Sequence, residues 1–530
     1  MPRRPGASRL APVALLAAAL VACDTPANAP LPPAAPASAP LALASNGNGN
    51  AWANGQVDEP STLDLIEADA ESGAIDRNNA ARYREYALLS PDKLPAKYRS
   101  TAIGKDGTES MRQTALAWRS LSAQTRKEIN DLRANGFGQL KDSLVTTHFI
   151  LHYTTQTDWG VPAIDADASG VPDYVEEAGK AFERSWQREI VELGYPAPKQ
   201  VALGEKFHVY FRDIKFYGYC VPENVVLEQT APVPAGTATA WIVIENDFRG
   251  FLPNDVDVTG NEPLRLGALR VTIAHEFMHA LQFNMNVFAP SGWLFESHAT
   301  WAEDQVYDEV NDWRWYLRGF FARPDLPIFN RFIYGAAFYQ HHLSETYGLD
   351  VPRRIWLATR QVPPDEAVRR EAYGAQGWEP FTGFGPVQYT LGIEDFASNA
   401  PSIVPRATLR LRTTHAAYPV SVDVPASTNK VANLAPWGLG ANAIEFLPAA
   451  GGTTLRLTFD GTDGAAWRAI AIGTRANGTT ASWPITLDAG SAGNVTVAGL
   501  GTQYVKVALV ALIADRPGAA VPFRYGATLQ

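Results

Sequence analysis

Cysteine is almost absent from this sequence, since Cys23 and Cys220 are the only two in 530 residues. A disulfide framework therefore cannot be what stabilises the fold. Basic runs are missing as well, apart from the arginines at the extreme N-terminus, and the formal net charge is −10. A chain without a basic patch gives no reason to expect a nucleic-acid partner. The 46% hydrophobic content excludes a disordered chain, and the length predicts two or three folded units.

The apolar run near the N-terminus, Ala11 to Val21, is too short to span a bilayer as a helix. It follows several arginines and ends in Leu20-Val21-Ala22-Cys23, which resembles the lipobox of bacterial lipoproteins. The resemblance implies that residues 1–22 are a lipoprotein signal peptide and that Cys23 is lipidated; an ordinary secretory signal is the alternative. We therefore expect a lipid-anchored protein of the bacterial cell envelope, with its folded part outside the cytoplasm and the membrane leaflet undecided.

Composition and periodicity change along the chain and predict its organisation. Residues 23–60 are rich in Ala, Pro and Asn and predict a disordered tether. Residues 61–142 predict a helical segment with helices near 63–70, 81–89 and 109–135. No chemistry is evident in that segment, which is either a packing subdomain or an inhibitory prosegment. Residues 143–398 predict the domain that carries the site, and residues 399–530 a β-sandwich.

Within the middle region the pattern predicts strands near 147–153, 206–213 and 239–246. A long amphipathic helix is expected over 173–193, with Gly194 as its C-terminal cap. Two or three further helices follow between 263 and 347. Cys220 lies in an aromatic, strand-like stretch and is expected to be a buried thiol.

The clearest chemical motif is a single predicted helical turn that carries His275, Glu276 and His279 inside an apolar stretch. Residues four apart lie on one face of a helix, so both imidazoles can bind the same ion. Glu276 is displaced by about 100° from His275 around the helix axis, which places it beside the ion. Such a pattern predicts a Zn²⁺ site with two His ligands.

A second predicted helix offers the third ligand. Glu296 follows His279 by seventeen positions, enough for a turn and an antiparallel return. The run Trp293-Leu-Phe-Glu296-Ser-His-Ala-Thr-Trp-Ala-Glu303 resembles the Trp-Leu-x-Glu-Gly helix of gluzincin metallopeptidases, although its separation from the HExxH helix is slightly shorter. Glu296 is thus the expected third ligand, and His298 is the competing one.

The resemblance covers roughly residues 61–350, is most specific at 273–304, and extends to a poorly characterised family of secreted bacterial metalloproteases. It implies an α+β chain with a thermolysin-like catalytic domain.

Glu303 lies two turns beyond Glu296 and is expected to accept the N–H of a zinc-bound His, a surface acid being the alternative. Asp304 is expected at the surface. Gluzincins usually add a Tyr or His that stabilises the oxyanion; Tyr334 is our prediction, with Tyr339, His341 and His342 as alternatives.

These residues predict a membrane-anchored zinc metallopeptidase that hydrolyses peptide bonds of a peptide or protein substrate. Glu276 would act as the general base and a zinc-bound water as the nucleophile. An endopeptidase is favoured over an aminopeptidase, because only Ile244-Glu245-Asn246 partly matches the Gly-x-Met-Glu-Asn segment that holds a free amino terminus. The alternative from another class is a non-enzymatic envelope binding lipoprotein with a retained metal site.

A second metal, Ca²⁺, is suggested by the run Asp165-Ala-Asp167-Ala-Ser169-Gly170-Val-Pro-Asp173-Tyr-Val-Glu176. Its oxygen-bearing residues have the spacing of an EF-hand loop, with Gly at the sixth position and Ser at the fifth. A strand rather than a helix is expected before it, so the segment is not a full EF-hand. A turn with acidic helix-capping residues is the alternative.

Overall fold

The computed structural model describes residues 60–157, 159–258, 265–290, 292–330, 333–397, 402, 407–426, 435–515 and 519–530. The predicted signal peptide, the predicted lipidation residue Cys23 and the predicted tether up to residue 59 lie outside these ranges. None of the helices in the described ranges combines the length and the apolar character that crossing a membrane requires.

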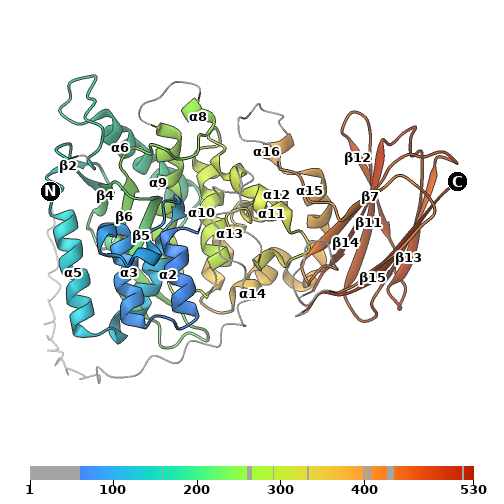
Figure 1. Ribbon diagram of the computed structural model, residues 1–530, viewed down its shortest axis with the longest axis horizontal. Coiled ribbons are helices and arrows are strands. Elements are labelled where there is room, and N and C mark those ends of the chain that lie inside the picture. The colour runs from blue at the N-terminus through green and yellow to red at the C-terminus, as the bar shows by residue number, and fades with distance from the viewer. Residues whose placement is uncertain are drawn as a thin grey trace, which may run out of the picture. The chain divides into compact units, whose positions relative to one another are not determined.

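The chain combines helices with three β-sheets, of six, four and five strands. This confirms the α+β class that the sequence predicts. Figure 1 shows the N-terminal helices in blue and cyan beside the green strands β4, β5 and β6, and the C-terminal strands in red.

Four α-helices form most of the N-terminal segment: α2 (Thr62–Glu71), α3 (Arg77–Leu89), α4 (Thr108–Ala117) and α5 (Ala123–Phe137). A capping box starts α2, because Ser61 Oγ accepts from the Asp64 amide while Asp64 Oδ2 accepts from the Ser61 amide. The single helix predicted over 109–135 is wrong. Leu121 is extended, and the Ser122 hydroxyl accepts from the Thr125 amide to cap a new helix.

The six-stranded sheet has the order β1-β5-β6-β4-β3-β2. Its strands are β1 (Gly104–Asp106), β2 (Asp142–Val145), β3 (Phe149–Tyr153), β4 (Phe207–Arg212), β5 (Phe216–Leu227) and β6 (Gly236–Glu245). Strands β3, β4 and β6 are parallel, whereas β5 is antiparallel to β6. The N-terminal segment 61–142 supplies β1 to this sheet, and β2 begins at its last residue, Asp142, so the segment is not purely helical.

Side chains alternate across this sheet and thereby bury both of its faces. Trp241 and Val243 of β6 pack with the core of α2 and α3. Ile242 and Ile244 point the other way, into the core that contains α9 (Leu266–Asn286). Since α9 packs on both β5 and β6, the sheet positions the HExxH helix directly.

The predicted helix over 173–193 is α6 (Asp173–Ser185) followed by the π-helical turn η4 (Trp186–Glu192). Gly194 has φ +76° and donates its amide to Ile190 O, so it closes the helix as predicted. The remaining helices are α7 (Lys199–Ala202), α8 (Asp255–Val258), α10 (Gly292–Val306), α11 (Leu317–Ala322), α12 (Ala337–Tyr347), α13 (Val351–Ala358), α14 (Pro364–Val368), α15 (Phe384–Thr390) and α16 (Glu394–Ala397). Short 3₁₀ turns include η5 (Asp312–Tyr316).

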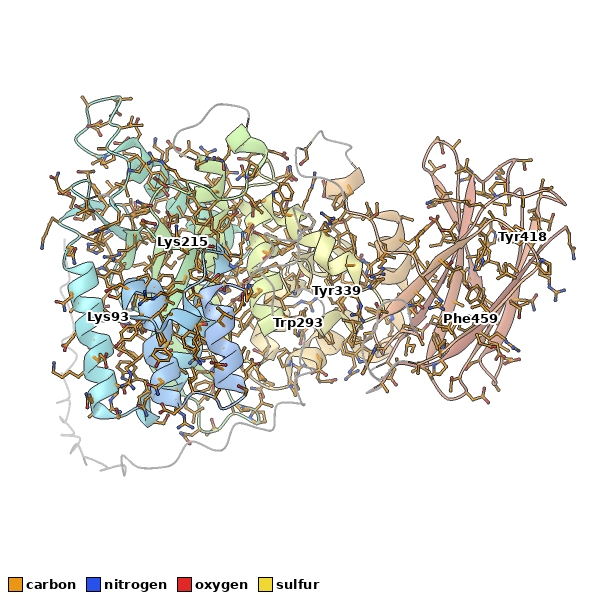
Figure 2. All side chains as sticks on the ribbon, viewed as in Figure 1. Lys93, Lys215, Trp293, Tyr339, Tyr418 and Phe459 are labelled. Atoms are coloured by element: carbon orange, nitrogen blue, oxygen red, sulfur yellow. The ribbon has the colours of Figure 1, made fainter. Side chains whose placement is uncertain are left out.

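The C-terminal strands form two sheets, β13-β10-β15-β8 and β12-β11-β14-β9-β7. They are β7 (Thr413–His415), β8 (Val420–Val424), β9 (Ala441–Phe446), β10 (Thr454–Gly461), β11 (Trp467–Thr474), β12 (Thr480–Ile485), β13 (Ala492–Ala498), β14 (Lys506–Ile513) and β15 (Phe523–Leu529). The sheets pack on each other through aromatic contacts, such as Phe459 of β10 against Trp467 of β11 at 5.3 Å between ring centroids (Figure 2). Tyr389 of α15 donates its hydroxyl to Glu445 of β9, which connects the helical region to these strands.

Candidate metal centre

Helices α9 and α10 pack against each other and bring His275, His279 and Glu296 together. His275 Nε2 lies 3.3 Å from Glu296 Oε2, and His279 Nε2 lies 3.7 Å from the same oxygen. Trp293, labelled in Figure 2, is on the first turn of α10, one turn before Glu296. The three ligands predicted from the sequence therefore converge on one point.

The converging atoms fit a tetrahedral ion. Bonds of 2.0–2.2 Å at tetrahedral angles place donor atoms roughly 3.3–3.6 Å apart, close to the distances found here. Within the described part of the chain, His275 Nε2, His279 Nε2 and Glu296 Oε2 are buried and have no hydrogen-bond partner. Buried polar atoms without partners are costly, and a cation among these three would satisfy all of them at once.

A fourth donor comes from β1 and was missed in the sequence. Asp106 joins His275, His279 and Glu296 in one cluster whose ligand atoms all lie within 4.8 Å of one another. Its Oδ2 is 3.8 Å from His279 Nε2. The neighbours of Asp106 in the sequence show no metal-binding spacing, and only the pairing of β1 with β5 carries it to the site. No local signal could have identified it.

The second nitrogen of each imidazole contacts an outer oxygen. His275 Nδ1 is 2.7 Å from Glu303 Oε1, the contact proposed for Glu303 from the sequence. His279 Nδ1 is 2.7 Å from Gln282 Oε1, a contact that the sequence reasoning missed although Gln282 is only three residues away. The Glu303 and Gln282 oxygens can each accept a hydrogen bond from a protonated Nδ1. The lone pairs on the two Nε2 atoms then remain available to bind an ion.

Lys105 balances the negative charge behind the site. Its Nζ lies 3.1 Å from Glu303 Oε1 and 3.1 Å from Asp312 Oδ2, and all three side chains are buried. The ammonium also lies over the rings of Tyr217 and Tyr316. Strand β1 thus contributes both a cation and a carboxylate to the region around the two imidazoles.

Glu276 lies between α9 and the sheet, next to the cluster. Its Oε2 accepts from Thr108 Oγ1 at 2.9 Å. Strand β5 can approach this side chain closely only because residue 218 is glycine: a Cβ there would lie 2.9 Å from Glu276 Cγ and 3.0 Å from Thr272 Cγ2. Gly218 and the Thr108 hydroxyl therefore together position Glu276, the expected base.

Burial dominates the electrostatics of the site. It lowers the pKa of His275 to about 3 and lowers the pKa of His279, so both rings are neutral near pH 7, the form that binds metals. It raises the pKa of Asp106 to about 7, with the negative charge of Glu296 adding to the effect. Burial also raises the pKa of Glu276 and of Glu296. Crowded buried carboxylates beside neutral imidazoles suit a divalent cation, whose charge would favour their ionised forms.

Tyr334 lies beside the cluster, with its ring centroid 6.3 Å from that of His275. Burial raises the pKa of the Tyr334 phenol further above 10, which keeps it a proton donor. The alternatives contact other groups: Tyr339 Oη is 2.6 Å from Tyr373 Oη, and His341 stacks on Trp313. His342 packs against Phe384.

Three further sequence expectations have clear outcomes. His298 is outside the cluster, since its Nε2 is 2.6 Å from Tyr195 Oη and its Nδ1 is 3.3 Å from Gln282 Nε2. The expectation of a surface Asp304 is wrong, because this residue is buried and accepts from Trp313 Nε1 in the core between α10 and η5. Cys220 is a buried free thiol, as predicted.

The acidic loop before α6 brings three of its five predicted oxygen donors together. Carboxylate oxygens of Asp165, Asp167 and Asp173 lie within 4.8 Å of one another. Glu176 is not in this group; its Oε1 accepts from Ser169 Oγ at 2.7 Å. The loop turns at Gly170, which has φ +88°. Its side chains are mostly exposed, unlike those of the buried cluster on α9 and α10.

Comparisons with known proteins add little to this geometry. A model of a family of unknown function, DUF6055, matches residues 262–484, a range that includes α9 and α10 but not Asp106. No curated protein matches the chain. One similar solved structure is a family GH115 4-O-methyl-α-glucuronidase with specificity for decorated arabinogalactans, at 9% identity and a TM-score of 0.15. The match covers 51% of this chain and 30% of the glucuronidase, and at that TM-score it supports no argument about fold or activity.

Proposed function

We propose that the chain is a zinc-dependent metallopeptidase in which His275, His279 and Glu296 hold the metal. The observation that carries the proposal is the convergence of two neutral imidazoles and a carboxylate, with Glu276 directly beside them. The resemblance of the α9 and α10 sequences to gluzincins supports the same assignment. We further propose that residues 143–398 have a thermolysin-like catalytic fold.

When bound, Zn²⁺ would lower the pKa of a water to about 7 and polarise a peptide carbonyl. Glu276 would accept a proton during attack and pass it to the leaving amine. Burial raises the pKa of Glu276, and the positive charge of a bound cation would oppose this and favour the ionised carboxylate that accepts the proton. Tyr334 would donate its hydroxyl to the developing oxyanion, and Glu303 and Gln282 would orient the two imidazoles.

The proposed substrate is an internal peptide bond of an unfolded or flexible protein. An aminopeptidase needs a group that holds a free amino terminus, and Ile244-Glu245-Asn246 is only a partial match to the segment that does so in that class. Glu245 accepts instead from the Ile214 amide in the loop after β4. End-group analysis of the products would separate the two activities: internal cleavage supports the proposal, and release of single N-terminal residues contradicts it.

The decisive test compares hydrolysis of an unfolded protein by the zinc-loaded parent and by Glu276→Gln. Loss of the base should reduce turnover by roughly 100-fold or more while the zinc content stays unchanged. Glu71→Gln, at the exposed C-terminal end of α2, is the matched control and should behave like the parent. Equal turnover of the parent and Glu276→Gln would reject the mechanism, and a chain that takes up no zinc would reject the site.

We propose an envelope location with a lipid anchor on Cys23, supported by the lipobox-like sequence alone. Expressed with its leader in a bacterial host, the chain should then fractionate with membranes. A Cys23→Ala variant should lose that association, because several acyl chains on this residue would supply the anchoring free energy. Membrane association that survives the substitution would contradict the assignment.

We also propose Ca²⁺ as a second metal, held by Asp165, Asp167 and Asp173. The spacing of the loop and the approach of the three carboxylates support this. Isothermal titration of the parent and of Asp167→Asn with Ca²⁺ tests it. Equal heats from both proteins would remove the assignment.

A further inference from the structure

We propose that residues Gly104–Thr108, here named the Asp106 strap, form an internal inhibitor that holds the metal centre latent. The inference rests on the proposed metallopeptidase function and concerns how that same site is regulated. It answers the question left open by the sequence, whether the N-terminal segment only packs on the domain or restrains it.

Asp106 completes the set of donor atoms around the metal centre. Catalytic zinc sites keep one position open, whereas sites closed by four protein ligands are structural. Asp106 Oδ2 is 3.8 Å from His279 Nε2, close to the 3.7 Å between His279 Nε2 and Glu296 Oε2. Asp106 thus holds the fourth corner of the cluster, the position that a reacting water would need. In this arrangement the centre turns over only while the strap is transiently displaced, so the parent keeps a low basal activity.

The strap also restrains the base. Thr108 Oγ1 is 2.9 Å from Glu276 Oε2 and 2.7 Å from Asp106 Oδ1. The same oxygen accepts from the Cys220 amide of β5, which fixes the hydroxyl between the sheet and the base. One threonine therefore holds the inhibitory carboxylate and the catalytic carboxylate in a single network.

The strap occupies one edge of the sheet. Asp106 pairs with Gly218 at the edge of β5, and the Gly104 and Gly107 amides donate to Lys215 O and Gly218 O. An extended peptide commonly binds a protein by adding to an exposed sheet edge in this way. The strap lies along the part of the β5 edge nearest Glu276, so it excludes any peptide from that edge.

The strap leaves no access from solvent to the metal ligands. The side chains of Asp106, His275, His279 and Glu296 are each at most 3% exposed. A protein substrate cannot reach donors buried to this extent. Some displacement must precede catalysis, and the strap is the element that contacts the metal ligands, the base and the sheet edge together.

Release must be limited to the strap. Helices α2 and α3 cover Tyr219, Trp241 and Val243 on the sheet, and removing the whole N-terminal segment would expose this apolar face to water. The strap is preceded by the exposed residues Arg99 and Thr101. A break in this link would free the N-terminal end of β1 and leave the covering helices in place.

The test uses the full chain loaded with Co²⁺ in place of Zn²⁺, because the visible spectrum of Co²⁺ reports the coordination geometry. Azide is the probe for an open position. We expect azide to leave the parent spectrum unchanged and to alter the spectra of Asp106→Ala and Asp106→Asn. Asp92→Ala, at an exposed aspartate of the same N-terminal segment, is the matched control and should match the parent. Peptide hydrolysis by Asp106→Ala should exceed that of the parent by roughly tenfold or more.

Two results would overturn the inference. A parent spectrum that responds to azide as the variants do would show that the fourth position is already open. Folded variants that no longer retain cobalt would show that Asp106 is a required structural ligand. Failure of the proposed function looks different: azide would distinguish the variants from the parent, yet no protein, with or without Glu276, would hydrolyse peptides.

Discussion

At Gly218, strand β5 and the side chain of Glu276 come within van der Waals distance of each other. Any other residue would bring a Cβ to 2.9 Å from Glu276 Cγ, closer than ordinary contacts allow. The backbone oxygen of Val243 lies 3.0 Å from the same point, so the strand cannot simply shift away. The absence of a Cβ at residue 218 therefore determines where the side chain of Glu276, the expected base, lies.

Gly218→Ala should accordingly displace Glu276 while the metal ligands stay in place. We expect peptide hydrolysis to fall by roughly tenfold or more, because small displacements of a catalytic group have large effects on rate. Overpacking should also lower the free energy of unfolding by about 1–3 kcal/mol. Gly383→Ala, where a Cβ meets nothing within 4 Å, is the control. Unchanged hydrolysis together with unchanged zinc content would contradict this account.

His342 makes the stability of the protein depend on pH. Burial lowers its pKa from 6.5 to about 4 in the folded chain. Between about pH 6.5 and pH 4 the His342 imidazole is protonated in the unfolded chain and neutral in the folded chain. The free energy of unfolding therefore falls as the pH drops from about 6.5 to about 4. Above that window the residue contributes nothing to the pH dependence, and the full effect is about 3 kcal/mol.

His342→Gln should remove this part of the acid sensitivity. Urea unfolding of the parent and the variant at several pH values between 4 and 7 measures the difference, and other buried histidines cancel in the comparison. Above about pH 7 the difference in free energy of unfolding between the two proteins should become independent of pH. Parallel curves across the window would mean that His342 titrates normally.

At the scale of elements, Lys105 joins β1, α10 and η5 through two buried carboxylates, Glu303 and Asp312. Its removal leaves two buried negative charges without their cation. Lys105→Met should therefore lower the free energy of unfolding by about 3–5 kcal/mol. Lys127→Met, which breaks an exposed i,i+4 pair with Asp131, is the control and should cost less than about 1 kcal/mol. Chemical denaturation measures both, and equal losses would contradict the proposed role of Lys105.

Elements with a strong local pattern could be predicted from the sequence. The HExxH turn on α9, the acidic residue on α10 and the alternating strands after residue 400 each follow from spacing within a few residues. Glu303 follows from helical periodicity once Glu296 is placed. These features are local, so one sequence contains the whole signal.

Elements defined by long-range pairing could not be predicted. Strand β1 has three residues and exists because it pairs with β5 more than a hundred residues later. Its Asp106 and Lys105 read as ordinary charges in a helical region. The burial of Asp304 has the same origin, since η5 folds back over α10 to supply Trp313. Periodicity identifies which face of a helix is apolar but not what covers it.

At the scale of the whole molecule, metal binding should increase the free energy of unfolding. Zn²⁺ at about 100 times its dissociation constant should add roughly 2.7 kcal/mol to the free energy of unfolding. Thermal melts with Zn²⁺ and with a chelator should therefore differ by a few degrees in Tm for a chain of this size. His275→Ala should melt at one temperature in both conditions. A zinc-dependent shift that persists in His275→Ala would place the ion elsewhere.

The wide sequence separation of the four donors has a consequence for biogenesis. Before tertiary contacts form, only the two imidazoles of one helical turn are close together, while Glu296 is on the next helix and Asp106 is far earlier in the chain. Two ligands hold an ion weakly, and the other two arrive only after the β1–β5 pairing and the α9–α10 packing have formed. If the centre binds a metal as proposed, tight capture would therefore be a late event that follows the completion of the fold rather than its nucleation.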